Sequence, residues 1–150
     1  MSKQPRVQLT HEAIERLTRL SDLFQLRREQ LASRAGLTVG QWSVLEEIST
    51  EHFMPSLFAQ NEATSRAAVS KVIRQLLDRG LIQVQISAVD GRQRDYALTP
   101  EGKNTLARLR AEREKAIEAI WLPLDPDALR HFSQFAGELI ERIQRHAAQE

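Results

Sequence analysis

A cluster of basic residues between Thr64 and Leu98 holds the side chains of this sequence best suited to chemistry. The segment carries six arginines and lysines against three aspartates, a local charge of +3, although the whole chain carries only +1. Guanidinium and ammonium groups concentrated in this way favour binding to a polyanion, because each phosphate contact releases condensed counterions. The basic residues are Arg66, Lys71, Arg74, Arg79, Arg92 and Arg94.

The first group of these residues falls on one face of a predicted helix that Ser65 caps and Gly80 ends. Apolar residues spaced three and four apart form the side that faces the core: Val69, Val72, Ile73, Leu76 and Leu77. The opposite side is small and basic, with no acidic residue before Asp78. We therefore expect contact with DNA through Arg66, Ala67, Ser70, Lys71 and Arg74.

The second group lies on a predicted β-hairpin. The stretch LIQVQISA, residues 81–88, alternates apolar and polar residues, and DYAL, residues 95–98, is its partner across a tight Asp90-Gly91 turn. A hairpin beside a helix in the major groove can reach the neighbouring minor groove, whose negative potential attracts arginine. Arg92 and Arg94 are the candidates for that contact, and Asp90 can orient an arginine side chain.

Other predicted helices precede this helix and hairpin in the sequence and must hold them in place. An apolar stripe predicts a helix over residues 10 to about 30, and a capping box at Thr38 and Gln41 opens the next helix. A short helix is predicted to begin at Leu57, with Ser56 as its cap.

Two long helices are predicted to follow the hairpin. Each begins with a capping residue and a proline, which suits the first helical position, and they span residues 100 to about 121 and 126 to about 148. The chain is therefore expected to be mainly α with a small β-hairpin wing. This order of elements predicts a winged helix-turn-helix with flanking N- and C-terminal helices.

A resemblance to the MarR family of bacterial transcription regulators is most specific in the segment SRAAVSKVIRQLLDRGLIQVQISAVDGRQRDYALTPEG. The wing of that family carries Asp-x-Arg and then Leu-Thr-x-x-Gly, which stand here as Asp90-Gly91-Arg92 and Leu98-Thr99-Pro100-Glu101-Gly102. The upstream LTVGQWSVLEEI resembles the family's second helix, so the resemblance covers nearly the whole chain. The recognition helix departs from the family pattern at Ala67, Ala68 and Arg74, which bears on base preference.

The resemblance implies a homodimer that binds a pseudopalindromic site on double-stranded DNA, with one recognition helix for each half-site. It implies one domain over residues 1–150, with a DNA-binding lobe at about 38–100 and dimerisation helices at about 10–34 and 101–148. The first and last helices of two subunits would intertwine. The predicted dimer interface comprises Ile14, Leu17, Leu20, Leu129, Phe132, Leu139, Ile140 and Ile143.

A small organic effector is a further implication of the resemblance, because ligands of this family bind between the dimerisation helices and the DNA-binding lobe. The aromatic candidates for lining such a pocket are Phe24, Trp42, Phe53 and Phe58. Ordinary core packing is the alternative for each ring, since large apolar side chains are buried mainly for stability. The expected function is a repressor whose operator binding is modulated by a small organic ligand.

Other classes of function are disfavoured by what the sequence lacks. There is no cysteine, and the four histidines, at positions 11, 52, 131 and 146, have no metal-ligand spacing. No catalytic motif stands out, so we expect no enzyme, metal or cofactor. The lack of a signal peptide or long apolar segment predicts a cytoplasmic protein with no membrane partner. The alternative function is a winged-helix adaptor that binds protein without binding DNA.

Overall fold

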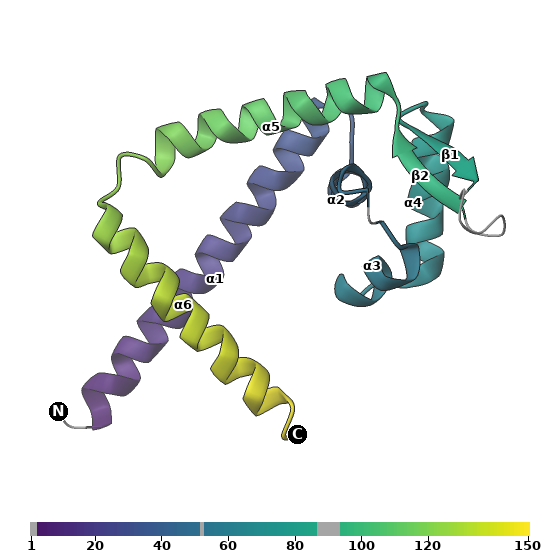
Figure 1. The fold of residues 1–150 in the computed structure, drawn as a ribbon. Coiled ribbons are helices and arrows are strands. Elements are labelled where there is room, and N and C mark those ends of the chain that lie inside the picture. Colours follow the sequence, from purple (N-terminus) through teal and green to yellow (C-terminus); the bar gives the residue numbers. More distant parts are fainter. Residues whose placement is uncertain (1–2, 52, 87–93) are drawn as a thin grey trace. The chain divides into compact units, whose positions relative to one another are not determined.

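The computed structural model describes residues 3–51, 53–86 and 94–150. Over these residues the chain forms six helices and one two-stranded antiparallel sheet (Figure 1). The elements are α1 (Lys3–Arg34), α2 (Val39–Ser49), α3 (Pro55–Asn61), α4 (Arg66–Asp78), β1 (Ile82–Ile86), β2 (Arg94–Leu98), α5 (Pro100–Ile120) and α6 (Pro126–Ala147). This order confirms the expected fold class, a mainly α winged helix-turn-helix.

Helix α1 begins at Lys3, so the start at Thr10 that the apolar stripe predicted is wrong. Pro5 lies in its first turn, where a backbone N–H has no helical acceptor and its absence does no harm. The helix ends at Arg34, close to Gly36, which takes a φ of +71°. That left-handed conformation closes helices and suits glycine, which has no β-carbon.

Side-chain caps begin other helices where they were predicted. In α2 the Thr38 hydroxyl accepts from the backbone N–H of Gln41, whose side chain accepts from the N–H of Thr38, both at 3.1 Å. Ser65 accepts from the N–H of Ala68 at 3.1 Å, and Asp125 caps α6. Each cap satisfies a backbone donor that has no partner within the helix.

Helix α3 corrects the prediction of a start at Leu57 behind a Ser56 cap. It begins at Pro55, and its cap residue Met54 makes no side-chain cap hydrogen bond. Proline is favoured at the first helical position because its φ is already helical and it lacks the N–H that would go unsatisfied. This preference outweighs the capping capacity of the serine that follows.

The hairpin is antiparallel and pairs Ile82 with Leu98 at its base and Ile86 with Arg94 at its far end. Strand β1 covers residues 82–86 of the alternating stretch, and residues 87 and 88 lie outside the described residues. Burial decreases along it, since Ile82 is 3% exposed while Val84 is 42% and Ile86 is 75% exposed. Among the described residues of the hairpin, those at its base join the core, whereas Ile86 and Arg94 at the far end of the two strands are exposed.

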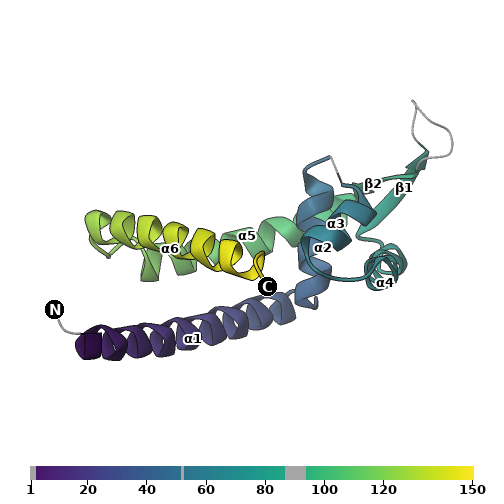
Figure 2. The same ribbon diagram turned by 90° about the horizontal axis from the view of Figure 1, so that it is seen from below.

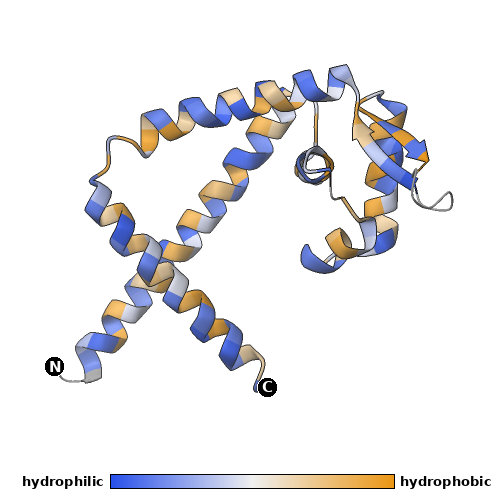
Figure 3. Cartoon of the chain, viewed as in Figure 1, coloured by the Kyte–Doolittle hydropathy of each residue, from blue (hydrophilic) through white to orange (hydrophobic). Residues whose placement is uncertain are grey.

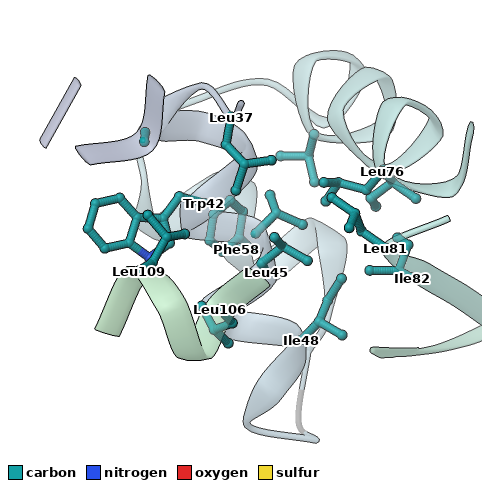
Figure 4. Close-up of a cluster of buried hydrophobic side chains, with 14 of the residues drawn as sticks. Leu37, Trp42, Leu45, Ile48, Phe58, Leu76, Leu81, Ile82, Leu106 and Leu109 are labelled. Atoms are coloured by element: carbon teal, nitrogen blue, oxygen red, sulfur yellow. The ribbon is translucent and has the colours of Figure 1, made fainter. Parts of the chain in front are cut away.

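The hydrophobic core lies among α2, α3, α4, the base of the hairpin and the first part of α5. Figure 4 shows Leu45 of α2 between Leu76 of α4 and Leu106 of α5, and Ile48 of α2 belongs to the same cluster. The end of α1 contributes Leu31 and Ala32 to the same cluster. Because α4 and the hairpin share one core with α2 and α5, their relative placement is fixed by packing.

Contacts between residues divide the chain into two units, Met1–Arg110 and Ala111–Glu150, and α5 runs from the first into the second. Within the first unit, α1 extends away from the group formed by α2, α3, α4 and the hairpin (Figure 2). Apolar residues recur along α1 and also along α6 (Figure 3). Among the described helices, none combines the length and the apolarity that crossing a bilayer requires.

Candidate nucleic-acid interface

The residues of α4 that were predicted to contact DNA form one exposed face, here called the basic face: Arg66, Ala67, Ser70, Lys71 and Arg74. Arg66, Ser70 and Arg74 follow one another at four-residue spacing, and the other two lie beside them. All five are solvent-exposed. In the part of the chain that the structure describes, its three cations have no ion-pair partner. Within the described residues, the basic face therefore presents positive charge that no acidic side chain contacts as an ion pair.

The opposite side of α4 anchors this face. Val69, Ile73 and Leu76 are 2%, 5% and 0% exposed, while Val72 and Leu77 are half-buried, which confirms the predicted inward set. The helix contacts α2, α3 and β1. Since its apolar side is held on three elements, the basic face is turned away from the core.

The wing places Arg94 at the first position of β2, where the residue is exposed and paired with Ile86. Asp90 and Arg92 lie outside the described residues, together with the Asp90-Gly91 turn. Their roles at the hairpin tip stay predictions from the sequence. Arg94 is thus the one predicted wing residue whose position in the structure can be stated.

The base of the wing is closed by hydrogen bonds around Thr99. Its backbone N–H donates to the Leu81 carbonyl at 3.1 Å, and its hydroxyl donates to the Gly80 carbonyl at 2.6 Å. The same hydroxyl accepts from the N–H of Gly102 at 3.1 Å. A β-carbon at position 102 would overlap the carbonyl of Leu81. The Leu-Thr-x-x-Gly motif is therefore a tight junction of hairpin and α5.

A polar cluster joins α2 to α5 around Glu46. The Trp42 indole N–H donates to Glu46 Oε1 at 3.2 Å, and Arg110 Nη2 donates to Glu46 Oε2 at 2.6 Å and to Ser49 Oγ at 3.1 Å. The hydrogen bond with Glu46, aided by its charge, raises the pKa of Arg110 above its ordinary value. The Arg28 guanidinium lies over the indole ring of Trp42, 5.9 Å from its centroid.

A groove of about 780 Å³ lies between the end of α2, strand β2 and α5. Its apolar lining includes Ile48, Phe53, Tyr96 and Leu106, and Lys103 and Arg110 are among its charged residues. The ring of Phe53 meets that of Tyr96 edge to face, with centroids 6.1 Å apart. Glu51 and Asp95 also line the groove, which therefore offers a mixed apolar and charged surface in direct contact with the wing.

The four aromatic residues proposed for an effector pocket have different surroundings. Phe53 is half-buried and lines the groove. Trp42 and Phe58 are 5% and 9% exposed and belong to the hydrophobic core, and Phe58 also borders a smaller cavity of about 240 Å³. Phe24 lies on α1 and is 49% exposed.

The residues predicted for the dimer interface lie on α1 and α6. On α1, Ile14, Leu17 and Leu20 are 55%, 48% and 43% exposed. On α6 the exposed members are Phe132, Ile140 and Ile143, whereas Leu129 and Leu139 are half-buried. Large apolar side chains on these helices thus face solvent in the single chain, in numbers unusual for a monomer.

The histidines do not assemble a site among the described residues. His11 and His131 are exposed, and His146 Nε2 lies 3.7 Å from a carboxylate oxygen of Glu150. His52 falls outside the described residues. Across residues 3–51, 53–86 and 94–150, no group of three metal-binding side chains comes together.

Sequence reasoning missed the polar contacts between distant segments. Gln41 was recognised as a capping residue, but its side chain also donates to Gln75 Oε1 at 3.1 Å. The ion pair of Glu46 with Arg110 was not foreseen either. Neither pair has a local sequence signal, because the partners lie 34 and 64 residues apart.

The chain is a winged helix-turn-helix with an exposed basic face on α4, and solved structures share this fold. A MarR family transcription regulator covers 98% of this chain and 98% of its own, with a TM-score of 0.86 and 19% sequence identity. Staphylococcus aureus MarR, solved with salicylate and kanamycin, has a TM-score of 0.77 and 18% identity over 92% of this chain and 94% of that one.

A third structure, a complex of S. aureus MepR with DNA, has a TM-score of 0.69 and 14% identity over 85% of this chain and 93% of that one. No family sequence model matches the chain, and no curated protein matches it in sequence. The likeness is therefore one of structure. The chain has the fold of the MarR family of transcription regulators, as the resemblance in the wing indicated.

Proposed function

We propose that this chain is a MarR-type transcription regulator that binds a pseudopalindromic operator as a homodimer. The observation that carries the proposal is the basic face of α4, whose cations are exposed and have no ion-pair partner in the described chain. A phosphate backbone supplies the negative charge that such a face lacks. MepR, which shares the fold, was solved in complex with DNA.

The roles within the basic face follow from its place on a recognition helix. The N-terminal part of such a helix meets base edges in the major groove, so Arg66, Ser70 and Lys71 are the candidates for base contact. Arg74 lies farther along α4 and suits a phosphate. Arg94 and, from the sequence, Arg92 would bind beside the helix from the wing, with Asp90 orienting an arginine.

The dimer is the second part of the proposal. The exposed apolar side chains of α1 and α6 support it, because a second copy of the chain would remove them from water. We assign dimerisation to residues of about 10–34 and 101–148 and DNA binding to about 38–100, within one functional domain. Operator binding also implies a cytoplasmic location, and the proposal includes no catalytic step.

Modulation by a small organic ligand is the third part, and repression is the simplest form of control. The groove beside the wing supports this part, because a ligand held against Phe53 would touch β2 directly. A ligand can shift operator binding only through a difference in affinity between the DNA-competent and incompetent states. Salicylate is a defined probe, since S. aureus MarR was solved with it.

The adaptor alternative requires exposed apolar residues on α4 for contact with a protein partner. Helix α4 exposes none of its large apolar side chains, because those that it has are buried or half-buried. The face available for a partner is basic and small, which fits phosphates better than an apolar protein surface.

Selection from a random pool of double-stranded DNA, with sequencing of the bound fraction, tests the proposal. We expect enrichment of an inverted repeat whose half-sites are about one helical turn apart. Failure to retain any DNA at low salt, by protein shown to be folded and dimeric, would favour the adaptor. Salicylate added to the complex should weaken binding, and unchanged binding would remove salicylate from the proposal.

A further inference from the structure

The contact between the end of α4 and the start of α2 is polar and centres on Gln41. This side chain is 8% exposed, and its amide group uses both of its ends. Its Nε2 donates to Gln75 Oε1 of α4 at 3.1 Å, while its Oε1 accepts from the Thr38 N–H at 3.1 Å and from Arg79 Nη1 at 3.4 Å. One buried amide therefore connects the cap of α2 with two residues at the end of α4.

Arg79 extends the same cluster to the turn between α1 and α2. Its Nη1 also donates to the Gly36 carbonyl at 2.5 Å. Gly36 has a φ of +71°, and a β-carbon there would approach Arg79 Nη2 to 3.3 Å. The turn is thus shaped so that its carbonyl receives the guanidinium that follows α4.

These hydrogen bonds do what the apolar packing between α2 and α4 does not. Apolar contacts hold helices together but have little directional preference. Hydrogen bonds lose strength steeply as their distance or angle departs from the optimum, so they fix a position along and around a helix. Arg74 and Gln75 are adjacent on α4. A shift or rotation of the helix that displaces Gln75 therefore displaces Arg74 as well.

We propose that Gln41 and Gln75 are positioning residues for DNA recognition, and that with Arg79 they set the direction in which the basic face is presented. This inference rests on the proposed function, because it concerns the fit of α4 to an operator. Neither glutamine lies on the basic face itself. Their effect on DNA is therefore exerted through the placement of Arg66, Ser70 and Lys71.

Gln75→Met is the first test variant, because it removes the bond between α2 and α4, leaves the capping box of α2 intact and changes no charge. Affinity for the selected operator should fall roughly tenfold or more, which is the decrease expected when side chains and base edges are misaligned. The slope of log affinity against log salt should stay at the wild-type value, since every phosphate-binding cation is still present. Affinity for unrelated DNA should also be unchanged.

Gln41→Met and Gln41→Glu form a matched pair at the other end of the bond. Methionine removes every hydrogen bond of the side chain and should lower operator affinity at least as much as Gln75→Met. Glutamate still accepts from Thr38 and Arg79, and it can accept from Gln75 once that amide turns over, so it should restore most of the affinity. The double variant with methionine at both positions should bind no worse than Gln41→Met alone.

Leu109→Ala is the control for stability: it should destabilise the fold without changing the position of α4. Leu109 is 2% exposed on α5, where Figure 4 shows it beside Trp42 and away from Leu76 of α4. Under conditions in which all variants are folded, this variant should bind the operator with wild-type affinity. Wild-type affinity and specificity in folded Gln75→Met would overturn the inference while leaving the proposed function standing. Absence of operator binding by the wild-type chain would overturn both.

Discussion

At the scale of single residues, the chain depends on small side chains at points of close approach. Gly102 is buried in the first turn of α5, where its Cα faces the carbonyl of Leu81. The hydroxyl of Thr99 bridges the same two segments. The hairpin base and α5 are therefore held at a distance that no β-carbon at position 102 permits.

Gly102→Ala should destabilise the chain by about 1–3 kcal/mol, because the added methyl group must push hairpin and helix apart. Urea unfolding followed by circular dichroism measures the change. Gly137→Ala is the matched control, since Gly137 lies within α6 with nothing near its would-be β-carbon. That control should be neutral or more stable by about 0.5–1 kcal/mol. Equal effects of both substitutions would refute the close approach.

At the scale of elements, the turn between α3 and α4 contains a residue in an unusual conformation. Ala63 has a φ of +50°, and the N–H of Thr64 after it donates to the Ala59 carbonyl at 2.9 Å. This left-handed residue closes α3 and redirects the chain toward the Ser65 cap of α4. Residues other than glycine adopt this conformation at a cost in free energy.

Ala63→Gly should therefore raise the free energy of unfolding by about 0.5–1 kcal/mol, because relief of strain exceeds the extra entropy of the unfolded chain. Thermal and urea unfolding measure the gain. Ser65→Ala, two residues later, should lower the same quantity by about 1 kcal/mol through loss of the α4 cap. A decrease on Ala63→Gly would mean that the turn carries no strain.

The elements also show which parts of the fold the sequence could predict. Caps such as Thr38 and Ser65, the break at Gly36 and the basic face all arise from residues close in sequence, so local patterns reveal them. The start of α1 at Lys3 was missed because no apolar stripe marks its first turns. The start of α3 was missed because two preferences conflict there: proline favours the first helical position at Pro55, whereas serine favours the N-cap at Ser56.

The candidate site was predictable only in part. The exposed and inward sides of α4 follow from helical periodicity, which fixes them once the helix is assigned. The bonds of Gln41 to Gln75 and of Glu46 to Arg110 join segments that only the folded chain brings together. The groove beside Phe53 likewise needs three elements at once, and no sequence spacing encodes its volume.

At the scale of the whole molecule, the proposal predicts that α6 forms part of a dimer interface. Ile140→Glu places a charge on an α6 side chain that is 55% exposed in the single chain. It should leave each chain folded but disfavour an interface in which that charge would be buried. Sedimentation should then show monomers, whereas the wild-type chain is expected to sediment as a dimer.

Gln134→Glu adds the same charge to an exposed position on the other side of α6 and is the control. It should sediment like the wild-type chain. A stable dimer of Ile140→Glu at the lowest concentration measured would place the interface elsewhere. An effect of Gln134→Glu equal to that of Ile140→Glu would point to general charge repulsion instead.

The central claim is that the basic face of α4 binds DNA, and its most direct test is the salt dependence of operator binding. For the wild-type chain, log affinity should fall linearly with log salt. Arg74→Ala should weaken binding and reduce that slope by roughly 1 for each phosphate that the arginine no longer neutralises. Arg130→Ala, which removes one charge from α6, should leave both unchanged. Identical curves for Arg74→Ala and the wild-type chain, or an equally large effect of Arg130→Ala, would contradict the account.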